Sequence, residues 1–370
     1  MEKKQRCALA LLILLCLMLP GCSFLHRGGE NGPTPAPTAQ PQKGGAHAAP
    51  KITPTPVVTP TPKPENQNLL TGEFTLLPEA IGKRPVAIMV NNIFDALPQY
   101  GISEADLIFE MPVEHGITRL MALYGDYTRV PQVCSVRSCR YYFPILAAGY
   151  DAYYVHWGQD ETIATEVLNR LDIDRMDGMT DTYGLFYRDQ DRAMEGYAYE
   201  HTGAFNGPQL VPALAGNGVR TDLPVNKSGP FFDFADTAKA PDGSPCTEPQ
   251  VVFSESYYSG FEYNAQSQLY YKSHSGSEHR DQRTGKRLAF TNLFLLETEI
   301  SQRDQVGRVN VDWQSGTGWY VSMGIACPIK WEKDDEYSNL VFYGKNGARL
   351  RVNPGKSYIS FSSPDTAYIQ

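Results

Sequence analysis

The chain lacks the patterns of several large functional classes. No block of basic residues with interleaved aromatic residues occurs, so a nucleic acid would find nothing to hold its phosphates, and no nucleic-acid partner is expected. There is no P-loop and no G-x-S-x-G, S-x-x-K or H-E-x-x-H motif, so the sequence gives no support to the enzyme classes that these motifs mark. No C-x-x-C pair occurs, and the sequence predicts neither a metal nor a cofactor.

Cysteine is also scarce in the part of the chain that is expected to fold. The chain has seven cysteines, of which three lie within the first 22 residues. The other four are Cys134, Cys139, Cys246 and Cys327. A disulfide between Cys134 and Cys139 is one alternative outside the cytosol, but buried free thiols are the default expectation.

The longest apolar run, from Cys7 to Leu19, is too short to span a bilayer and has the length of the apolar core of a signal peptide. Basic residues precede it, and Leu19-Pro20-Gly21-Cys22 follows. This end resembles the lipobox of bacterial lipoproteins, in which the cysteine receives diacylglycerol. The sequence therefore predicts a signal peptide over 1–21 and a lipid anchor on Cys22 at the extracytoplasmic face of the cell membrane. An ordinary secretory signal is the alternative.

Residues 22–70 are predicted to be a disordered stalk. Ten prolines lie between Pro33 and Pro64, many of them alternating with threonine, and aliphatic residues are almost absent. Such a segment buries too little apolar surface to offset the entropy of ordering it. Proline favours the extended polyproline II conformation, at about 3.1 Å per residue, so the stalk would reach up to about 140 Å. It would hold the folded part away from the membrane.

Charge separates the same parts. Residues 1–21 carry a net charge of +2 and residues 22–68 another +2, whereas the whole chain carries −8, so the remainder carries −12. An acidic body has no general attraction for anionic lipids or anionic wall polymers. Any anion site would have to be local.

The region 82–235 mixes predicted strands and helices. Serine at 103 and 138 can cap helices, and Asp160 with Thr162 opens another that runs to Leu171. A further helix is expected after Asn206-Gly207-Pro208. Strands are expected over 86–91, 107–111, 118–124 and 152–157.

A turn-rich boundary over 233–249 separates this region from the region 249–370, where antiparallel strands are expected. We therefore predict an α+β fold, with a mixed α/β N-terminal region packed with a mostly antiparallel β C-terminal region. The expected strands and hairpins cover 257–263, 268–273, 309–313, 318–323, 326–332, 340–343 and 349–352.

A series of segments follow one another in the chain, namely Arg84–Asn92, Gly101–Asp106, Gly116–Arg119, Val136–Ser138, Tyr150–His156, Thr284–Lys286 and Asn353–Lys356. With these segments, residues from about 82 to 362 resemble the YerB-like bacterial lipoproteins. The resemblance implies a lipoprotein with two tandem YerB-type regions and no established activity. Two departures from the family pattern are visible. Small residues would be expected where Cys134 and Cys139 stand, and a Pro-His-Asn run would be expected around His201.

Charged residues near the turn at 113–116 form the first candidate site. If the flanking strands pair symmetrically, Glu110 lies opposite Arg119 in a cross-strand ion pair. The structural interpretation is that these charges fix the hairpin. The functional one is that Glu114 and His115 project into a cleft. Pro112 excludes a helical two-carboxylate metal site.

A second group of residues could bind an anion. Arg137 and Arg140 flank the expected helix start at Ser138, where free backbone N–H groups favour negative charge. His156 ends an apolar strand, and ligand crevices in open α/β sheets lie beyond strand ends. The alternatives are ion pairs from the arginines to Glu110, Glu114 or Asp151, and a hydrogen-bonded core position for His156.

The C-terminal region offers a polar cluster of His279, Asp281 and Asn292, or a solvated turn that Asp281 holds. The tryptophans at 313, 319 and 331, with many tyrosines nearby, make a sugar-stacking face or part of the core. We interpret the protein as a membrane-anchored binding or scaffolding module whose partner is an envelope protein or a cell-wall polymer. The alternative is a hydrolase or phosphoryl-type transferase that acts on an envelope polymer.

Overall fold

The computed structural model describes residues 65–370, which belong to one compact unit. The expected signal peptide, Cys22 and the expected stalk up to residue 64 lie outside the described residues. Asn68 and Leu70 are already buried, so the last residues assigned to the stalk belong to the folded body. None of the helices in 65–370 is long and apolar enough to cross a membrane.

The apolar runs of the N-terminal region form the middle of a large sheet. In β1 (Val86–Asn91), Ala87 and Met89 face one hydrophobic core, whereas Val86 and Ile88 face another. Burial on both faces explains why these strands read as continuous apolar runs rather than as alternating ones. The strands that accompany β1 are β2 (Leu107–Pro112), β3 (Thr118–Tyr124), β5 (Tyr153–His156) and β6 (Arg175–Asp177).

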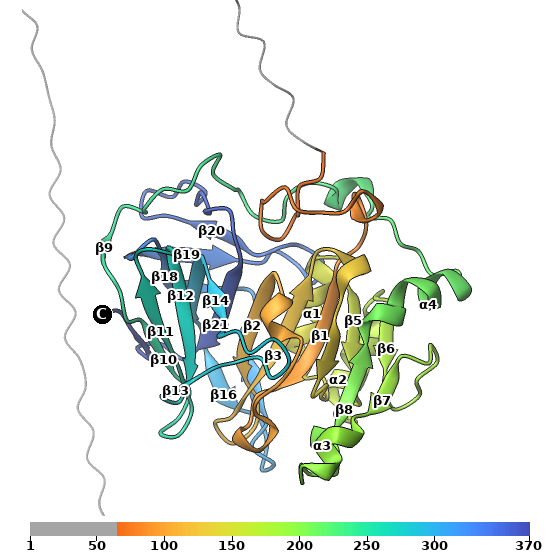
Figure 1. Cartoon of the computed structure of the whole chain (residues 1–370). Coiled ribbons are helices and arrows are strands. Elements are labelled where there is room, and N and C mark those ends of the chain that lie inside the picture. The colour runs from red at the N-terminus through yellow and green to blue at the C-terminus, as the bar shows by residue number, and fades with distance from the viewer. Residues whose placement is uncertain (1–64) are drawn as a thin grey trace, which may run out of the picture. The chain divides into compact units, whose positions relative to one another are not determined.

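The C-terminal region extends the same sheet. β21 (Ser357–Ser362) pairs in parallel with β2, so that Leu107 lies opposite Ser357. The strand order is β20-β19-β18-β15-β21-β2-β3-β1-β5-β6, and β9 also pairs with β19. Figure 1 shows this order as blue strands that continue into orange and yellow ones. The remaining members are β9 (Ser244–Pro245), β15 (Asn292–Glu297), β18 (Ser315–Ser322), β19 (Ile325–Glu332) and β20 (Val341–Tyr343).

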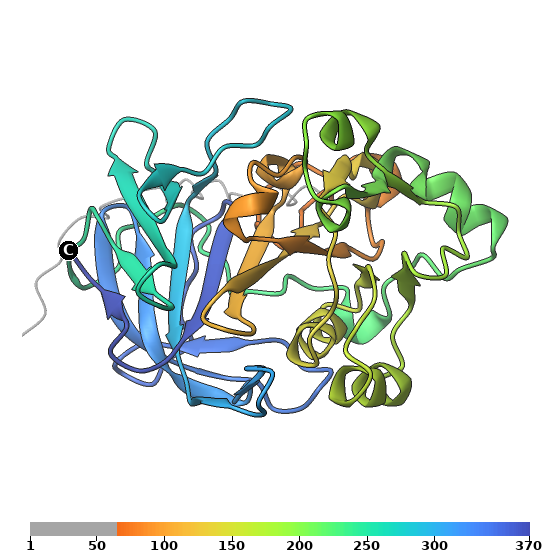
Figure 2. The same cartoon turned by 90° about the horizontal axis from the view of Figure 1, so that it is seen from below.

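Different layers cover the two faces of the large sheet. Helices α1 (Tyr142–Gly149) and α2 (Ile163–Arg170) pack on one face, and a six-stranded sheet packs on the other. Figure 2 shows these layers on opposite sides of the blue and orange strands. The six-stranded sheet comprises β10 (Gln250–Val252), β11 (Tyr258–Asn264), β12 (Leu269–His274), β13 (Ser277–Glu278), β14 (Ala289–Phe290) and β22 (Ala367–Tyr368).

Smaller elements complete the body. Three strands form a separate sheet, namely β4 (Gln132–Cys134), β7 (Phe186–Arg188) and β8 (Gly203–Asn206). A hairpin joins β16 (Ile300–Gln302) to β17 (Val309–Val311). The other helices are α3 (Gln190–Met194) and α4 (Leu210–Gly216).

The α+β fold class is confirmed, and so are most of the predicted strands. Two predicted helix starts are wrong. Ser103 lies in a single 3-10 turn, Ile102–Glu104, and β2 begins three residues later, at Leu107. Ser138 caps nothing, because α1 begins four residues later, at Tyr142. Asp160, in contrast, accepts hydrogen bonds from the backbone N–H groups of Thr162 and Ala164 at the start of α2, as predicted.

Candidate functional site

The turn between β2 and β3 carries a compact arginine–glutamate cluster. Arg140 donates to both carboxylate oxygens of Glu114, at 2.6 Å from Nη2 and 3.0 Å from Nε. Arg119 donates to the same carboxylate at 3.0 Å and to the carbonyl of Ser138 at 2.6 Å. Burial disfavours the charged carboxylate, but the two guanidinium groups outweigh it and lower the pKa of Glu114.

The predicted pairing of Glu110 with Arg119 is wrong. Glu110 lies opposite Leu120, and Arg119 lies opposite Met111. The connection holds one residue more than symmetric pairing assumes, because Pro112 pairs with Thr118 across residues 113–117. A register shift of one residue turns a side chain to the other face of the sheet. Glu110 and Arg119 therefore point away from each other.

Glu110 is instead the centre of a buried polar network that joins the two regions. Its Oε1 accepts from Asn92 at 2.8 Å and from Thr118 at 2.6 Å. Its Oε2 accepts from the hydroxyl of Ser259 at 2.6 Å, and Ser259 in turn accepts from Lys272 Nζ at 2.8 Å. The Lys272 ammonium lies 3.9 Å from the carboxylate and is fully buried. The N-terminal region thus supplies the anion, and the C-terminal region supplies the cation.

Sequence reasoning missed Ser259, Lys272 and His274, although a signal was present. Strand β12 alternates between buried and half-buried residues, and its inward positions are Tyr270, Lys272 and His274. A lysine at an inward position of an alternating strand is unusual unless it is paired. The pattern therefore indicated a buried partner for Lys272, but not which residue it is.

The three predicted members of the second polar cluster do not meet as a group. His279 is buried and shares a 2.8 Å hydrogen bond with Gln99. Asp281 holds its turn by accepting from the backbone N–H groups of Arg283 and Thr284, but it is buried rather than solvated. Asn292 lies in β15, where it donates to the carbonyl of Asn353.

The buried histidines make stability sensitive to mild acid. Burial, followed by the nearby charge of Lys272, lowers the pKa of His279 well below its usual 6.5. The unfolded chain takes up this proton first, so stability is fully present above pH 6.5 and falls as the pH drops toward the folded-state pKa. We expect His279→Gln to make the unfolding free energy depend less steeply on pH between about pH 6.5 and 5. Denaturant titrations of both proteins measure this, and parallel curves would contradict it.

Arg137 and His156 do not join Arg140 around a single ligand position. Arg140 uses its side chain on Glu114 and on the carbonyl of Cys139. His156 is fully buried, is stacked on Tyr154 and shares a 3.0 Å hydrogen bond with the carbonyl of Gly158. Burial lowers its pKa, and Asp177 at 3.9 Å opposes that effect. This geometry favours ion pairing for Arg140 and a core position for His156.

Arg137 differs from its neighbours. Its backbone N–H is bonded to Met89, but its buried Nε has no hydrogen-bond partner. Burial lowers its pKa, and the charge of Glu200 opposes that effect.

The four cysteines at 134, 139, 246 and 327 are all buried free thiols, as predicted.

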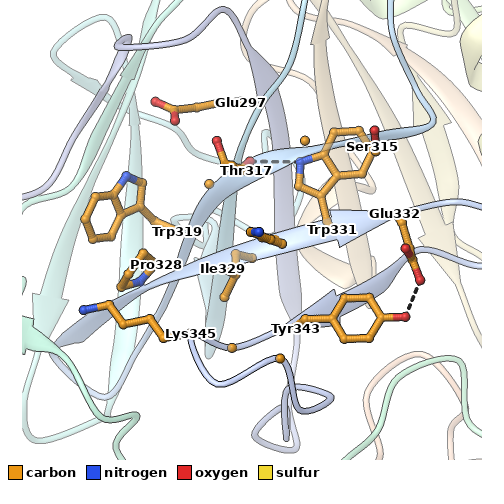
Figure 3. Close-up of a pocket in the computed structure, with 15 residues that line it drawn as sticks. Glu297, Ser315, Thr317, Trp319, Pro328, Ile329, Trp331, Glu332, Tyr343 and Lys345 are labelled. Atoms are coloured by element: carbon orange, nitrogen blue, oxygen red, sulfur yellow. Dashed lines mark hydrogen bonds between the residues drawn. The ribbon is translucent and has the colours of Figure 1, made fainter. Parts of the chain in front are cut away.

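A groove on the outer face of β18, β19 and β20 was not predicted as a site. Its volume is about 820 Å³. Trp319 lies opposite Pro328 on the next strand, and Lys330 lies opposite both Thr317 and Tyr343. Figure 3 shows Trp319 and Tyr343 on different sides of the groove, with Lys345 and Glu332 beside them. The Tyr343 hydroxyl donates to Glu332.

Of the tryptophans that could form a sugar-stacking face or part of the core, one belongs to the core and one lines the groove. Trp331 is buried, packs against Phe361 and donates to the carbonyl of Thr317, so it belongs to the core. Trp319 is half-buried and lines the groove. Side chains on one face of β18, β19 and β20, three strands that follow one another in the chain, can reach a ligand in the groove.

The molecule is a two-region α+β protein in which a single sheet crosses the boundary between the regions. The N-terminal domain of DUF3048, described as a protein of unknown function, matches residues 70–214, and the DUF3048 C-terminal domain matches residues 250–359. The chain therefore belongs to the DUF3048 family.

A Bacillus subtilis (strain 168) protein named “Putative lipoprotein YerB” is 28% identical over 287 residues, which are 75% of this chain and 81% of that protein. The crystal structure of the YerB protein from Bacillus subtilis has a TM-score of 0.70 and 27% identity, and it covers 81% of this chain and 98% of that chain. The predicted resemblance to the YerB-like lipoproteins is thus confirmed.

Proposed function

We propose that this protein is a lipoprotein anchored through Cys22 to the outer face of the cell membrane, where its folded part binds a component of the envelope. The observation that carries the binding role is the open groove of about 820 Å³, with Trp319 and Tyr343 at its surface. Concave surfaces with aromatic side chains and a few placed polar groups are typical of ligand sites. The partner is a cell-wall polymer or an envelope protein, and not a nucleic acid.

The anchor rests on the Leu19–Cys22 segment and on the name of the Bacillus relative. A lipid anchor followed by a proline-rich stalk would place the groove beyond the membrane surface, within reach of wall material. One acyl chain binds a membrane only reversibly, whereas a second one makes the attachment stable. The diacylglycerol of a lipoprotein cysteine supplies two chains.

An enzyme is the less supported alternative. The residues predicted to act as acid or base are Glu110, Glu114 and His156. Glu110 and His156 are buried, at 1% and 0% exposure, and Glu114 is neutralised by two arginines. Glu110 and His156 therefore cannot touch a polymer at the surface, and Glu114, which is partly exposed, is already engaged by Arg119 and Arg140.

Replacement of the lipidated cysteine tests the anchor. In Cys22→Ala cells we expect no incorporation of labelled palmitate into the protein and a shift of the protein from the membrane to the soluble fraction. The same substitution at Cys246, a buried thiol, leaves the lipid label unchanged and serves as the control. Wild-type protein that takes up no palmitate, or that fractionates with the cytosol, would contradict the proposal.

A second experiment separates binding from catalysis. The full chain with Cys22→Ala, which cannot carry the lipid, is incubated with isolated cell envelopes from the producing organism. We expect it to sediment with them and to release no soluble fragments from the polymer. Release of such fragments, abolished by Glu114→Gln or His156→Gln in folded protein, would instead favour the enzyme.

A further inference from the structure

The inner part of the groove lies on the face of a sheet, at β18, whereas β20 at the other side of the groove is the last strand of that sheet. Strand β18 pairs with β15 on one side and with β19 on the other. The backbone groups of β18 are therefore already used, and an extended peptide has no free strand there to pair with. A ligand that lies across β18 must be recognised by side chains.

Two aromatic residues stand apart on this face. Trp319 on β18 and Tyr343 on β20 are separated by two strand spacings and by two residues along the strands, as the pairs Trp319↔Pro328 and Lys330↔Tyr343 show. With about 4.8 Å between strands and about 3.3 Å per residue, the two Cα atoms are roughly 12 Å apart. A single sugar ring cannot span that distance, but several linked rings can. Pro328 supplies an apolar surface between the two aromatic rings.

Tyr343 is held in position from one side. Its hydroxyl donates to the Glu332 carboxylate, and Glu332 lies on the adjacent strand. A hydrogen bond to a charged acceptor is stronger than one between neutral groups, so it fixes the direction of the ring. Ring orientation matters for stacking because the face of an aromatic ring is apolar and carries a negative quadrupole.

The charges of the groove cancel. Lys330 and Lys345 are positive, and Glu297 and Glu332 are negative. Burial raises the pKa of Glu297. A polymer with phosphate or carboxylate on every unit needs a surplus of positive charge in its site, and the folded part as a whole is acidic. The groove offers no such surplus.

From this geometry we propose, as an extension of the function above, that the groove binds an uncharged or sparsely charged polysaccharide strand. Trp319 and Tyr343 stack on two separate sugar rings, and Pro328 contacts the rings between them. Thr317, Lys330 and Glu297 form hydrogen bonds with hydroxyl groups along the polysaccharide. The inference rests on the binding role, but it adds the class of ligand and the residues that read it.

The test uses the detergent-solubilised full chain and calorimetric titration with defined sugars. The probes are chitohexaose and laminarihexaose as uncharged strands, N-acetylglucosamine as a single ring, polyphosphate and alginate as polyanions, and an uncharged decapeptide. We expect at least one uncharged hexasaccharide to bind and the single ring to bind at least tenfold more weakly. Tighter binding of a polyanion or of the peptide would overturn the proposal.

Two variants locate the site. Trp319→Ala and Tyr343→Ala should each weaken hexasaccharide binding on the order of tenfold, which corresponds to about 1.4 kcal/mol. Tyr368→Ala is the matched control, because Tyr368 is exposed on β22 and does not line the groove. Unchanged thermal unfolding shows that each variant is folded. Hexasaccharide binding that survives both substitutions together would overturn the assignment.

The outcomes keep this proposal distinct from the general one. If no sugar binds while the full chain still sediments with isolated envelopes, the ligand class is wrong and the binding role stands. If the protein binds neither the sugars nor the envelopes, both proposals fail. If the envelope interaction is lost in Trp319→Ala but no sugar binds, the groove contacts a protein.

Discussion

Glu110→Ala should lower the free energy of unfolding by about 3–5 kcal/mol, because it leaves a fully buried ammonium group without its anion. Lys272 would keep a hydrogen bond to Ser259 but lose the carboxylate 3.9 Å away. The donors of Asn92 and Thr118 would lose their acceptor as well. An unsatisfied buried donor costs about 1–3 kcal/mol by itself. Chemical denaturation at neutral pH measures the change.

Glu262→Ala provides the control for this loss. Glu262 lies on β11, the strand that carries Ser259, and forms a 3.1 Å ion pair with Arg287, but its side chain is 67% exposed. Exposed pairs contribute about 0–1 kcal/mol, so we expect a change within that range. A loss from Glu110→Ala no larger than the loss from Glu262→Ala would mean that the network does not hold the two regions together.

The double variant Glu110→Leu with Lys272→Met separates the pair from its surroundings. Apolar groups of similar size remove the cost of burying both charges, so the double variant should lose less than the sum of the two single replacements. Ser259, Asn92 and Thr118 would still lack their acceptor, so some loss remains. A double loss equal to that sum would show that Glu110 and Lys272 act independently.

The N-terminal strands could be predicted from the sequence because each strand shows its burial in its own run of apolar residues. β1 and β3 are apolar at consecutive positions, since both faces of the sheet are covered. The hairpin of β11 and β12 was readable from alternation around the turn at 264–267, and α2 from the cap at Asp160. In each case the signal lies within about ten residues.

The candidate site was harder to predict because its geometry depends on distant parts of the chain. A single extra residue between β2 and β3 moved Glu110 to the other face, and His115 and Gly116 accommodate it with positive φ angles of 55° and 73°. The partner of Glu110 lies more than 150 residues away, in the second region. The groove is formed by the consecutive strands β18, β19 and β20, but their alignment side by side cannot be derived from the sequence of any one of them.

Glu114→Ala should have the second large effect, again about 3–5 kcal/mol of unfolding free energy. It leaves Arg119, which is 5% exposed, without a carboxylate, and it also strips Arg140 of its partner. Burial already lowers the pKa of Arg119 to about 10. Glu278→Ala is the control, because Glu278 forms a 2.6 Å pair with Arg280 but is 51% exposed, and we expect it to change stability by less than about 1 kcal/mol.

The dependence of stability on pH and on phosphate distinguishes a structural role of the arginine–glutamate cluster from a role in anion binding. The folded-state pKa of Glu114 is lowered from its usual 4.5, so its contribution is present above about pH 4.5 and is lost as the pH falls through the folded value. The stability difference between wild type and Glu114→Gln should therefore shrink below that pH. If the cluster instead served to bind an anion, phosphate would stabilise the wild type, in which the arginines are intact, more than it stabilises Arg140→Ala. Equal phosphate effects on both proteins would leave Glu114 as the partner that these arginines are built to hold.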